Sequence, residues 1–303
     1  MDDIKIMPPE EVEKMFARLG ELSLDISGIR RKFLNCPYGE DPMQALDIYL
    51  PNDGGGPFPI VFFAHGGAWS GGSKSDTQLV PFIGGVDRGY AIISLDYRLL
   101  PDIRYPENLF DIKAAMRWVA INADTYLLDP SRTALCGASA GAHLAMMAAF
   151  TQGQTVFGDK LGVPTCTVLA VVDQFGPTDI LKYHTQYDES GYPRAKIPGV
   201  EGPEDELLGV NAELIPHLLR FFNPFDNVHS GIPPVLIQHG KYDPIIPYQQ
   251  SVGLYNKIQS VAGEGMAELD LSEEFLHADP GYAADESIER IFGFIDKHLR
   301  TRA

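Results

Sequence analysis

The sequence predicts one α/β domain in which a mostly parallel central sheet is covered by helices on both faces. Short apolar runs alternate with longer segments of helical character along most of the chain, an order typical of parallel strands joined by crossover helices. The length of 303 residues fits one large α/β domain or two small ones. No internal repeat, low-complexity tract or linker is visible, so residues 1–303 are expected to form a single domain.

Individual elements follow from local patterns. Two prolines precede, and one glycine follows, a segment at about residues 9–20, which is predicted to be an N-terminal helix. Runs rich in β-branched and aromatic residues predict strands. These lie at residues 45–50, 59–64, 91–95, 132–136, 168–172, 234–240 and 266–271. Helically spaced apolar residues or Ala-rich composition predict helices at residues 107–122, 140–150 and 288–299.

Residues 177–233 depart from this alternation because they contain no clean strand. The segment holds acidic and Tyr-rich turns, followed by an apolar run at residues 215–222. Long insertions of this kind commonly cover a functional site. We therefore expect a partial cap over the site; the alternative is a surface loop with one short helix.

The sequence Gly137-Ala138-Ser139-Ala140-Gly141 fits the G-x-S-x-G pattern of a nucleophile elbow. In that motif the serine lies on a sharp turn between a strand and a helix, and the glycines let backbone segments approach closely. A strand is predicted before Ser139 and a helix after it. Ser139 is therefore the candidate nucleophile, and a Gly/Ser turn without chemistry is the alternative.

A second glycine motif, His65-Gly66-Gly67-Ala68-Trp69, follows the strand predicted at residues 59–64. Acyl transfer passes through a tetrahedral oxyanion that preorganised backbone N–H groups stabilise. Glycines allow a loop to turn such groups inward, and the residue after the nucleophile supplies another. The candidate donors are Gly66, Gly67 and Ala140; a tight turn that merely follows a strand is the alternative.

The base is expected after the nucleophile and the acid, because such sites run in the order serine, acid, histidine. His277 and His298 are the two histidines near the C-terminus. His298 falls in the last turn of an amphipathic helix, where a surface role is expected. His277 lies in a loop after the last predicted strand and is the candidate base.

The candidate acid is Asp243, just beyond the carboxyl end of the strand predicted at residues 234–240. Open α/β sheets place their functional groups at these strand ends. An Asx-type turn before proline is the alternative role for Asp243. The competing acids are Asp173, Asp179, Asp270, Glu273 and Glu274.

Three further residues have two possible roles. Trp69 and Tyr97 could line an acyl or alcohol pocket, or they could simply pack in the core. His143 lies one helical turn after Ser139 and is expected to be a structural hydrogen-bonding residue, with contact with the site as the alternative. The serine chemistry needs neither a metal nor a cofactor, and Cys36 and Cys166 have no metal-ligand spacing.

Composition excludes several partner classes. The formal net charge of −17 argues against nucleic acid and anionic membrane surfaces. Hydrophobic content of 45% and charged content of 21% are ordinary for a soluble globular protein. No span of about 20 apolar residues and no signal pattern is visible, and three cysteines suggest no disulfide framework. We expect a cytoplasmic protein with a small-molecule ester substrate, possibly a homo-oligomer through its N-terminal helix or cap.

Together these motifs resemble the α/β-hydrolase carboxylesterases with a His-Gly-Gly-x-Trp loop, over nearly the whole chain. Four segments are similar to the bifunctional feruloyl and acetyl xylan esterase-like (BD-FAE-like) branch, at residues 46–51, 96–99, 175–179 and 277–280. The resemblance implies the α/β-hydrolase fold and a serine carboxylesterase that hydrolyses small-acyl or hydroxycinnamoyl esters through an acyl-enzyme. It also implies Ser139 as nucleophile, His277 as base and Asp243 as acid.

Alternative functions remain open. Kynurenine formamidase-like amide hydrolases share the His-Gly-Gly-x-Trp loop and an elbow like that at residues 139–143. Hormone-sensitive-lipase-like short-chain esterases usually carry an acidic residue before the serine, where this chain has Ala138. A binding module of the same fold would have a broken triad, whereas all three candidate residues are present here.

Overall fold

The computed structural model describes residues 6–19, 22–195 and 202–300. Within these residues, eight strands form one sheet in the order β1-β2-β4-β3-β5-β6-β7-β8. β1 pairs antiparallel with β2, and β2 with β4, whereas the other neighbours are parallel. The strands are β1 Arg31–Pro37, β2 Ala45–Leu50, β3 Phe58–Ala64, β4 Ala91–Leu95, β5 Leu128–Ala138, β6 Val168–Gln174, β7 Val235–Gly240 and β8 Ala267–Ser272.

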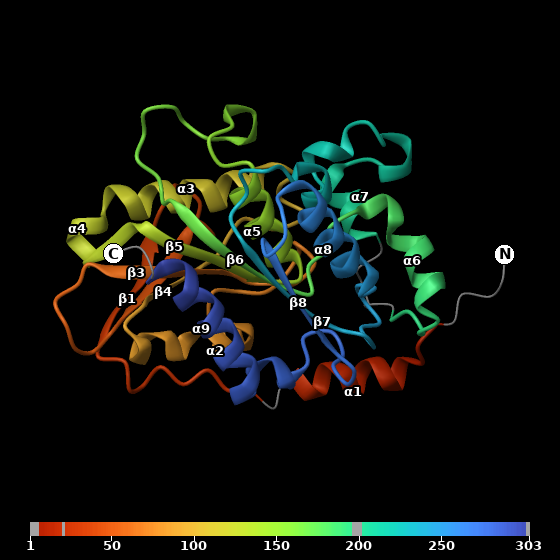
Figure 1. Ribbon diagram of the computed structural model, residues 1–303, viewed down its shortest axis with the longest axis horizontal. Coiled ribbons are helices and arrows are strands. Elements are labelled where there is room, and N and C mark those ends of the chain that lie inside the picture. Colours follow the sequence, from red (N-terminus) through yellow and green to blue (C-terminus); the bar gives the residue numbers. More distant parts are fainter. Residues whose placement is uncertain (1–5, 20–21, 196–201, 301–303) are drawn as a thin grey trace.

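Helices cover both faces of the sheet and bury a separate apolar core on each (Figure 1). One face packs against α3, α5 and α8, and the other against α2 and α9. The helices are α1 Pro9–Leu19, α2 Val80–Ile83, α3 Glu107–Ile121, α4 Ala123–Tyr126, α5 Ala140–Phe150, α6 Tyr183–Ser190, α7 Pro203–Leu208, α8 Gln249–Val261 and α9 Asp285–Leu299. This arrangement confirms the predicted α/β class with its mostly parallel sheet.

The segment between β6 and β7 has the irregular character that its sequence predicts. The described part of residues 177–233 adds no strand to the sheet and contains α6, α7 and several 3₁₀ turns. The apolar run at residues 215–222 contributes the 3₁₀ turn Leu219–Phe221, and the adjacent Phe222 is buried in the core. The segment is thus attached to the sheet through packed side chains.

Helix α1 connects two parts of the molecule that lie far apart in the sequence. Val12 packs with Ala195, which follows α6, and Arg18 forms an ion pair of 3.0 Å with Asp279. Asp279 lies two residues after the candidate base. The N-terminal helix therefore lies beside both the insertion and the loop that carries His277 (Figure 1).

The three cysteines, Cys36, Cys136 and Cys166, are free and buried. Cys136 is in β5, three residues before Ser139, and is fully buried in the core. Among the helices of the described chain, none has both the length and the apolar character needed to cross a membrane.

Candidate active site

Ser139 lies on a strained turn between β5 and α5. Its φ of 51° and ψ of −120° belong to a region that residues with a side chain rarely adopt. A Cβ on Gly137 would lie 2.4 Å from the carbonyl carbon of Gly141, and one on Gly141 would lie 2.1 Å from Ala64 O. The two glycines are required because α5 contacts the ends of β3 and β5 through bare backbone.

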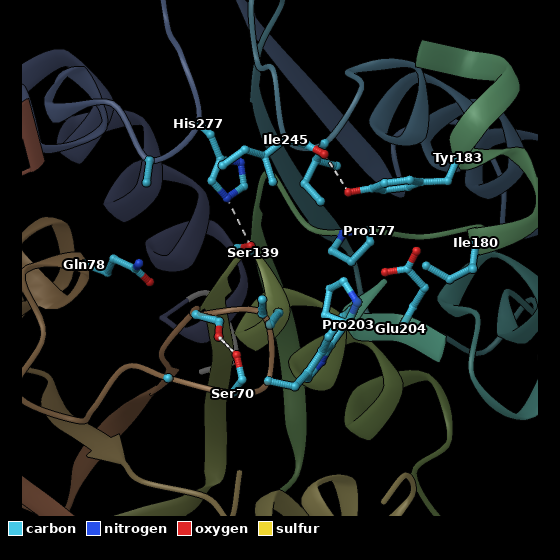
Figure 2. Close-up of a pocket in the computed structure, with 17 residues that line it drawn as sticks. Ser70, Gln78, Ser139, Pro177, Ile180, Tyr183, Pro203, Glu204, Ile245 and His277 are labelled. Atoms are coloured by element: carbon cyan, nitrogen blue, oxygen red, sulfur yellow. Dashed lines mark hydrogen bonds between the residues drawn. The ribbon is translucent and has the colours of Figure 1, made fainter. Parts of the chain in front are cut away.

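The structure brings the three predicted residues into one hydrogen-bonded chain. Ser139 Oγ lies 3.1 Å from His277 Nε2, and the two residues face each other across the cavity mouth (Figure 2). His277 Nδ1 lies 2.7 Å from Asp243 Oδ2. The carboxylate accepts, so Nδ1 carries the proton and Nε2 is free to accept the serine proton.

Asp243 is held as a buried carboxylate. Its Oδ1 accepts hydrogen bonds from the N–H groups of Ile245 and Ile246, both at 2.8 Å. Burial alone would raise the pKa of Asp243, but His277 and His239 together lower it well below its usual value. Asp243 therefore remains charged at neutral pH and can stabilise a protonated His277.

The oxyanion loop differs from the expectation in one residue. The N–H of Gly66 donates to Gln78 Oε1 at 2.7 Å, so it is already used, and Gly66 does not line the cavity. Gly67, Ala68 and Ala140 do line it. No hydrogen-bond acceptor for their N–H groups occurs among the described residues. The sequence analysis missed Ala68.

The difference at Gly66 has a conformational cause. Gly67, Ala68 and Trp69 have φ values of 121°, 52° and 57°, and all three residues of this left-handed run line the cavity. No sequence pattern signals a positive φ at an alanine. The structure therefore shifts the candidate donor set by one residue, to Gly67, Ala68 and Ala140.

Of the two candidate pocket residues, Trp69 and Tyr97, one lines the cavity and the other does not. Trp69 lines the cavity and also packs edge-on against His143, with ring centroids 5.3 Å apart. Tyr97 does not line the cavity and has the second of its two expected roles, packing in the core. Its buried hydroxyl donates to His65 O at 2.8 Å, and its ring stacks on His65, so Tyr97 supports the oxyanion loop from behind.

His143 has the structural position that was expected. Its Nε2 lies 2.7 Å from the carbonyl of Phe222, and its ring packs on the Phe222 ring. Burial lowers the pKa of His143 to about 4. A neutral His143 thus donates a hydrogen bond that ties the elbow helix to the insertion.

The remaining candidates lie outside the hydrogen-bonded chain. His298 is on α9, where its ring packs against Phe294. Asp173 accepts from Gly176 N–H at 2.9 Å, and Glu274 is exposed. Ion pairs engage three further acids: Asp179 with Lys182, Asp270 with Arg290 and Glu273 with Lys241.

A cavity of about 300 Å³ opens beside Ser139 and His277. The insertion supplies much of its wall, including Tyr183 of α6 and Glu204 of α7 (Figure 2). Glu204 is 8% exposed, and it is the one carboxylate among the described lining residues. The other wall residues from the insertion and the Asp243 loop are apolar: Pro177, Ile180, Pro203, Ile245 and Ile246.

Across the described ranges, no group of three or more His, Cys, Asp or Glu side chains is arranged to hold a metal ion.

Fold and site together define an α/β-hydrolase with a hydrogen-bonded serine, histidine and aspartate at the carboxyl ends of its strands. Comparison with known proteins gives the particular family. The chain belongs to the BD-FAE family, which it matches over residues 46–258.

The chain is similar to curated esterases. It is 30% identical over 244 residues to Esterase LipC of Mycobacterium tuberculosis, covering 80% of this chain and 58% of that protein. It is 25% identical to the versiconal hemiacetal acetate esterase of Dothistroma septosporum, covering 78% and 72%. The chain spans 48–59% of the length of the first four curated relatives.

Solved structures agree in fold. A truncated carbohydrate esterase from gut microbiota superposes with a TM-score of 0.78 at 26% identity, covering 91% of this chain and 99% of that one. Esterase B from Lactobacillus rhamnosis gives a TM-score of 0.73 at 22% identity, covering 97% and 93%; at that identity it shows only the shared fold.

Proposed function

We propose that this protein is a serine carboxylesterase. The observation that carries the proposal is the chain from Ser139 through His277 to Asp243, with distances of 3.1 Å and 2.7 Å. It stands at the mouth of a cavity also lined by Gly67, Ala68 and Ala140. The named esterases among its relatives support the same activity.

The geometry supports a two-step reaction. His277 Nε2 takes the proton of Ser139, and Oγ attacks the ester carbonyl carbon while the N–H groups of the loop face the developing oxyanion. His277 then gives the proton to the departing alcohol, which leaves an acyl group on Ser139. A water molecule, deprotonated by His277, releases the acid and restores the serine. Asp243 orients His277 and balances its charge throughout.

The substrate that we propose is an ester formed by a short-chain carboxylic acid or a hydroxycinnamic acid. Its alcohol part carries further free hydroxyl groups, as a sugar does. A cavity of about 300 Å³ is at the small end of ligand sites, which favours a short acyl group such as acetyl. The cavity lining carries polar side chains, among them Ser70, Gln78 and Glu204, which suit the hydroxyl groups of a sugar-like alcohol. The similarity to a carbohydrate esterase supports this choice.

The test compares initial rates on p-nitrophenyl acetate, an acetylated sugar and methyl ferulate, with Ser139→Ala as the blank. We expect turnover of acetate esters and a loss of at least 10³-fold in the variant, about the size of losing a nucleophile. A folded Ser139→Ala protein with full activity would overturn the proposal.

The other outcomes select among substrates. Strong methyl ferulate turnover would indicate that the pocket admits an aromatic acyl group. Hydrolysis of an N-formyl aromatic amine without ester hydrolysis would establish a formamidase instead. A serine-reactive fluorophosphonate probe should label wild type but not Ser139→Ala, which separates an enzyme from a binding module.

A cytoplasmic location, the absence of nucleic-acid and membrane partners, and a possible homo-oligomer stay predictions from the sequence. Size-exclusion chromatography with light scattering measures the oligomeric state directly.

A further inference from the structure

A second histidine contacts the catalytic carboxylate from the side opposite to His277. His239 is the fifth residue of β7 and is fully buried. Its Nε2 lies 3.2 Å from Asp243 Oδ2, the same oxygen that His277 Nδ1 contacts at 2.7 Å. Asp243 Oδ2 therefore lies between two imidazole rings.

The neighbours of His239 determine which ring nitrogen carries the proton. Its Nε2 faces two acceptors, Asp243 Oδ2 and the carbonyl of Ile246 at 2.9 Å, so Nε2 must be the donor. Its Nδ1 lies 2.7 Å from Ser251 Oγ of α8. A neutral ring then accepts at Nδ1 from the Ser251 hydroxyl, and both ring nitrogens are satisfied.

We propose that His239 and Ser251 are positioning residues that extend the triad to five members: Ser251, His239, Asp243, His277 and Ser139. The inference rests on the proposed esterase function. Ser251 fixes the tautomer of His239, whose Nε2–H donates to Ile246 O and lies 3.2 Å from Asp243 Oδ2. That polar contact fixes the carboxylate's orientation and takes up part of its charge. No proton passes through His239 during turnover.

The contact between His239 and Asp243 lowers the basicity of His277. A carboxylate that shares its charge with two donors attracts a protonated imidazole less than one that serves a single donor. His239 thus reduces the stabilisation that Asp243 gives to a protonated His277. A base whose pKa lies lower is deprotonated, and active, at lower pH.

The charged and titratable surroundings of the two histidines are few. His277 faces Asp243 and Ser139, with the Phe175 ring against it, and the cavity that it lines also holds the titratable side chains of Tyr183 and Glu204. His239 faces Asp243, and the Asp173 carboxylate of β6 acts on it electrostatically. His239 also borders a second, polar cavity of about 240 Å³ whose titratable residues are Asp270, Tyr282, Glu286 and Arg290.

The experiment measures kcat/KM against pH for His239→Leu, His239→Gln and Ser251→Ala. In His239→Leu we expect the acid limb of the profile to move up by roughly half a unit or more, because Asp243 loses one of its donors. In His239→Gln, an amide N–H can reach the Nε2 position, so the limb should return toward that of wild type. Ser251→Ala should shift the limb in the same direction as His239→Leu but by less.

The matched control is Ser260→Ala. Ser260 lies on the same helix, α8, and its hydroxyl donates only to Lys257 O at the exposed surface. This variant should leave the profile unchanged. An unmoved acid limb in both His239→Leu and Ser251→Ala, with only a reduced amplitude or a lower melting temperature, would show that His239 is merely structural.

A second readout needs no turnover. NMR titration of ¹⁵N-histidine-labelled protein follows the pKa of His277 in each variant, and it should rise in His239→Leu. If wild type hydrolyses no ester while this rise is seen, the proposed function fails and the positioning inference stands. If wild type is active and the His277 pKa does not move in folded variants, the positioning inference fails alone. If His239→Leu does not fold, the Ser251→Ala and His239→Gln titrations decide.

Discussion

Gln78 holds the oxyanion loop with a single side-chain oxygen. Its Oε1 accepts the N–H of Gly66 at 2.7 Å, and its side chain also borders the cavity. Replacement by methionine leaves the Gly66 N–H without its acceptor. An unsatisfied donor of this kind costs about 1–3 kcal/mol of free energy in the native loop conformation. We expect kcat for an acetate ester to fall by about tenfold or more, because the loop can turn Gly66 toward a new partner.

The control for Gln78→Met is Gln259→Met. Gln259 Oε1 also accepts a backbone N–H, that of Gly265 at 3.0 Å, but at an exposed turn far along the chain from the loop. Steady-state kinetics should show wild-type kcat in this variant. Equal losses of kcat in both variants would contradict a special role for Gln78.

Single residues also show where sequence reasoning about the site succeeds and where it stops. Ser139, Asp243 and His277 were identifiable because the order of the triad and the ends of strands constrain them. The shift from Gly66 to Ala68 was not, because it depends on three consecutive residues with positive φ, Gly67, Ala68 and Trp69. The two possible roles of Tyr97 could not be distinguished, because the sequence pattern of an aromatic residue after a strand is the same whether its hydroxyl faces the cavity or His65 O.

At the scale of elements, the fit of α5 against β3 depends on Gly141. A Cβ there would lie 2.1 Å from Ala64 O and 2.3 Å from His65 O, and these are backbone atoms. Gly141→Ala must therefore push the elbow helix off the sheet. We expect a loss of about 1–3 kcal/mol in the free energy of unfolding by urea, together with loss of esterase activity.

Gly293→Ala is the matched change in a helix without such a contact. Gly293 lies in α9, and no heavy atom lies within 4 Å of where its Cβ would be. Alanine stabilises a helix relative to glycine by about 0.5–1 kcal/mol. Urea unfolding should show opposite signs for the two variants. Destabilisation by both would mean that glycine is required in these helices for another reason.

The same scale explains which elements the sequence revealed. The central strand β4, Ala91–Leu95, is buried along its whole length, so its apolar run gave its bounds. The central strand β5, Leu128–Ala138, begins with partly exposed residues, so the run at residues 132–136 gave only part of it. The edge strand β1, Arg31–Pro37, is largely exposed and carries an irregularity in its register, so no periodic pattern predicts it. The helices of residues 177–233 have only eight and six residues, which is too short for a repeating apolar face to stand out in the sequence.

For the molecule as a whole, one buried carboxylate should govern part of the pH dependence of stability. Asp173 is fully buried, and its Oδ2 has no hydrogen-bond partner among the described residues. Burial raises the pKa of Asp173 to about 7, against about 3.9 when unfolded. Between these values the folded protein retains a proton that the unfolded chain releases, so stability falls as pH rises, and the whole penalty is present above pH 7.

Asp173→Asn should remove this penalty. The amide oxygen can still accept the Gly176 N–H, which Asp173 Oδ1 accepts at 2.9 Å. Relative to wild type, we expect the free energy of unfolding to be higher at pH 8, by up to about 4 kcal/mol, and nearly equal at pH 4. Urea denaturation at several pH values measures the difference.

The control is Asp53→Asn, which changes the net charge of −17 by the same amount at a carboxylate that is 99% exposed. Any effect of overall charge repulsion is then common to both variants. A difference from wild type that is constant with pH in Asp173→Asn would contradict the assigned protonation.

The burial of Cys136 directly beneath the elbow gives the protein an internal reporter. Burial raises the pKa of the Cys136 thiol far above its usual value and that of Cys166 to about 12, and alkylating reagents attack only an accessible thiolate. In the native state these two thiols should therefore not react with iodoacetamide, and they should be alkylated once the sheet opens. Mass spectrometry of timed alkylation would then read the opening rate of the sheet without any added fluorophore.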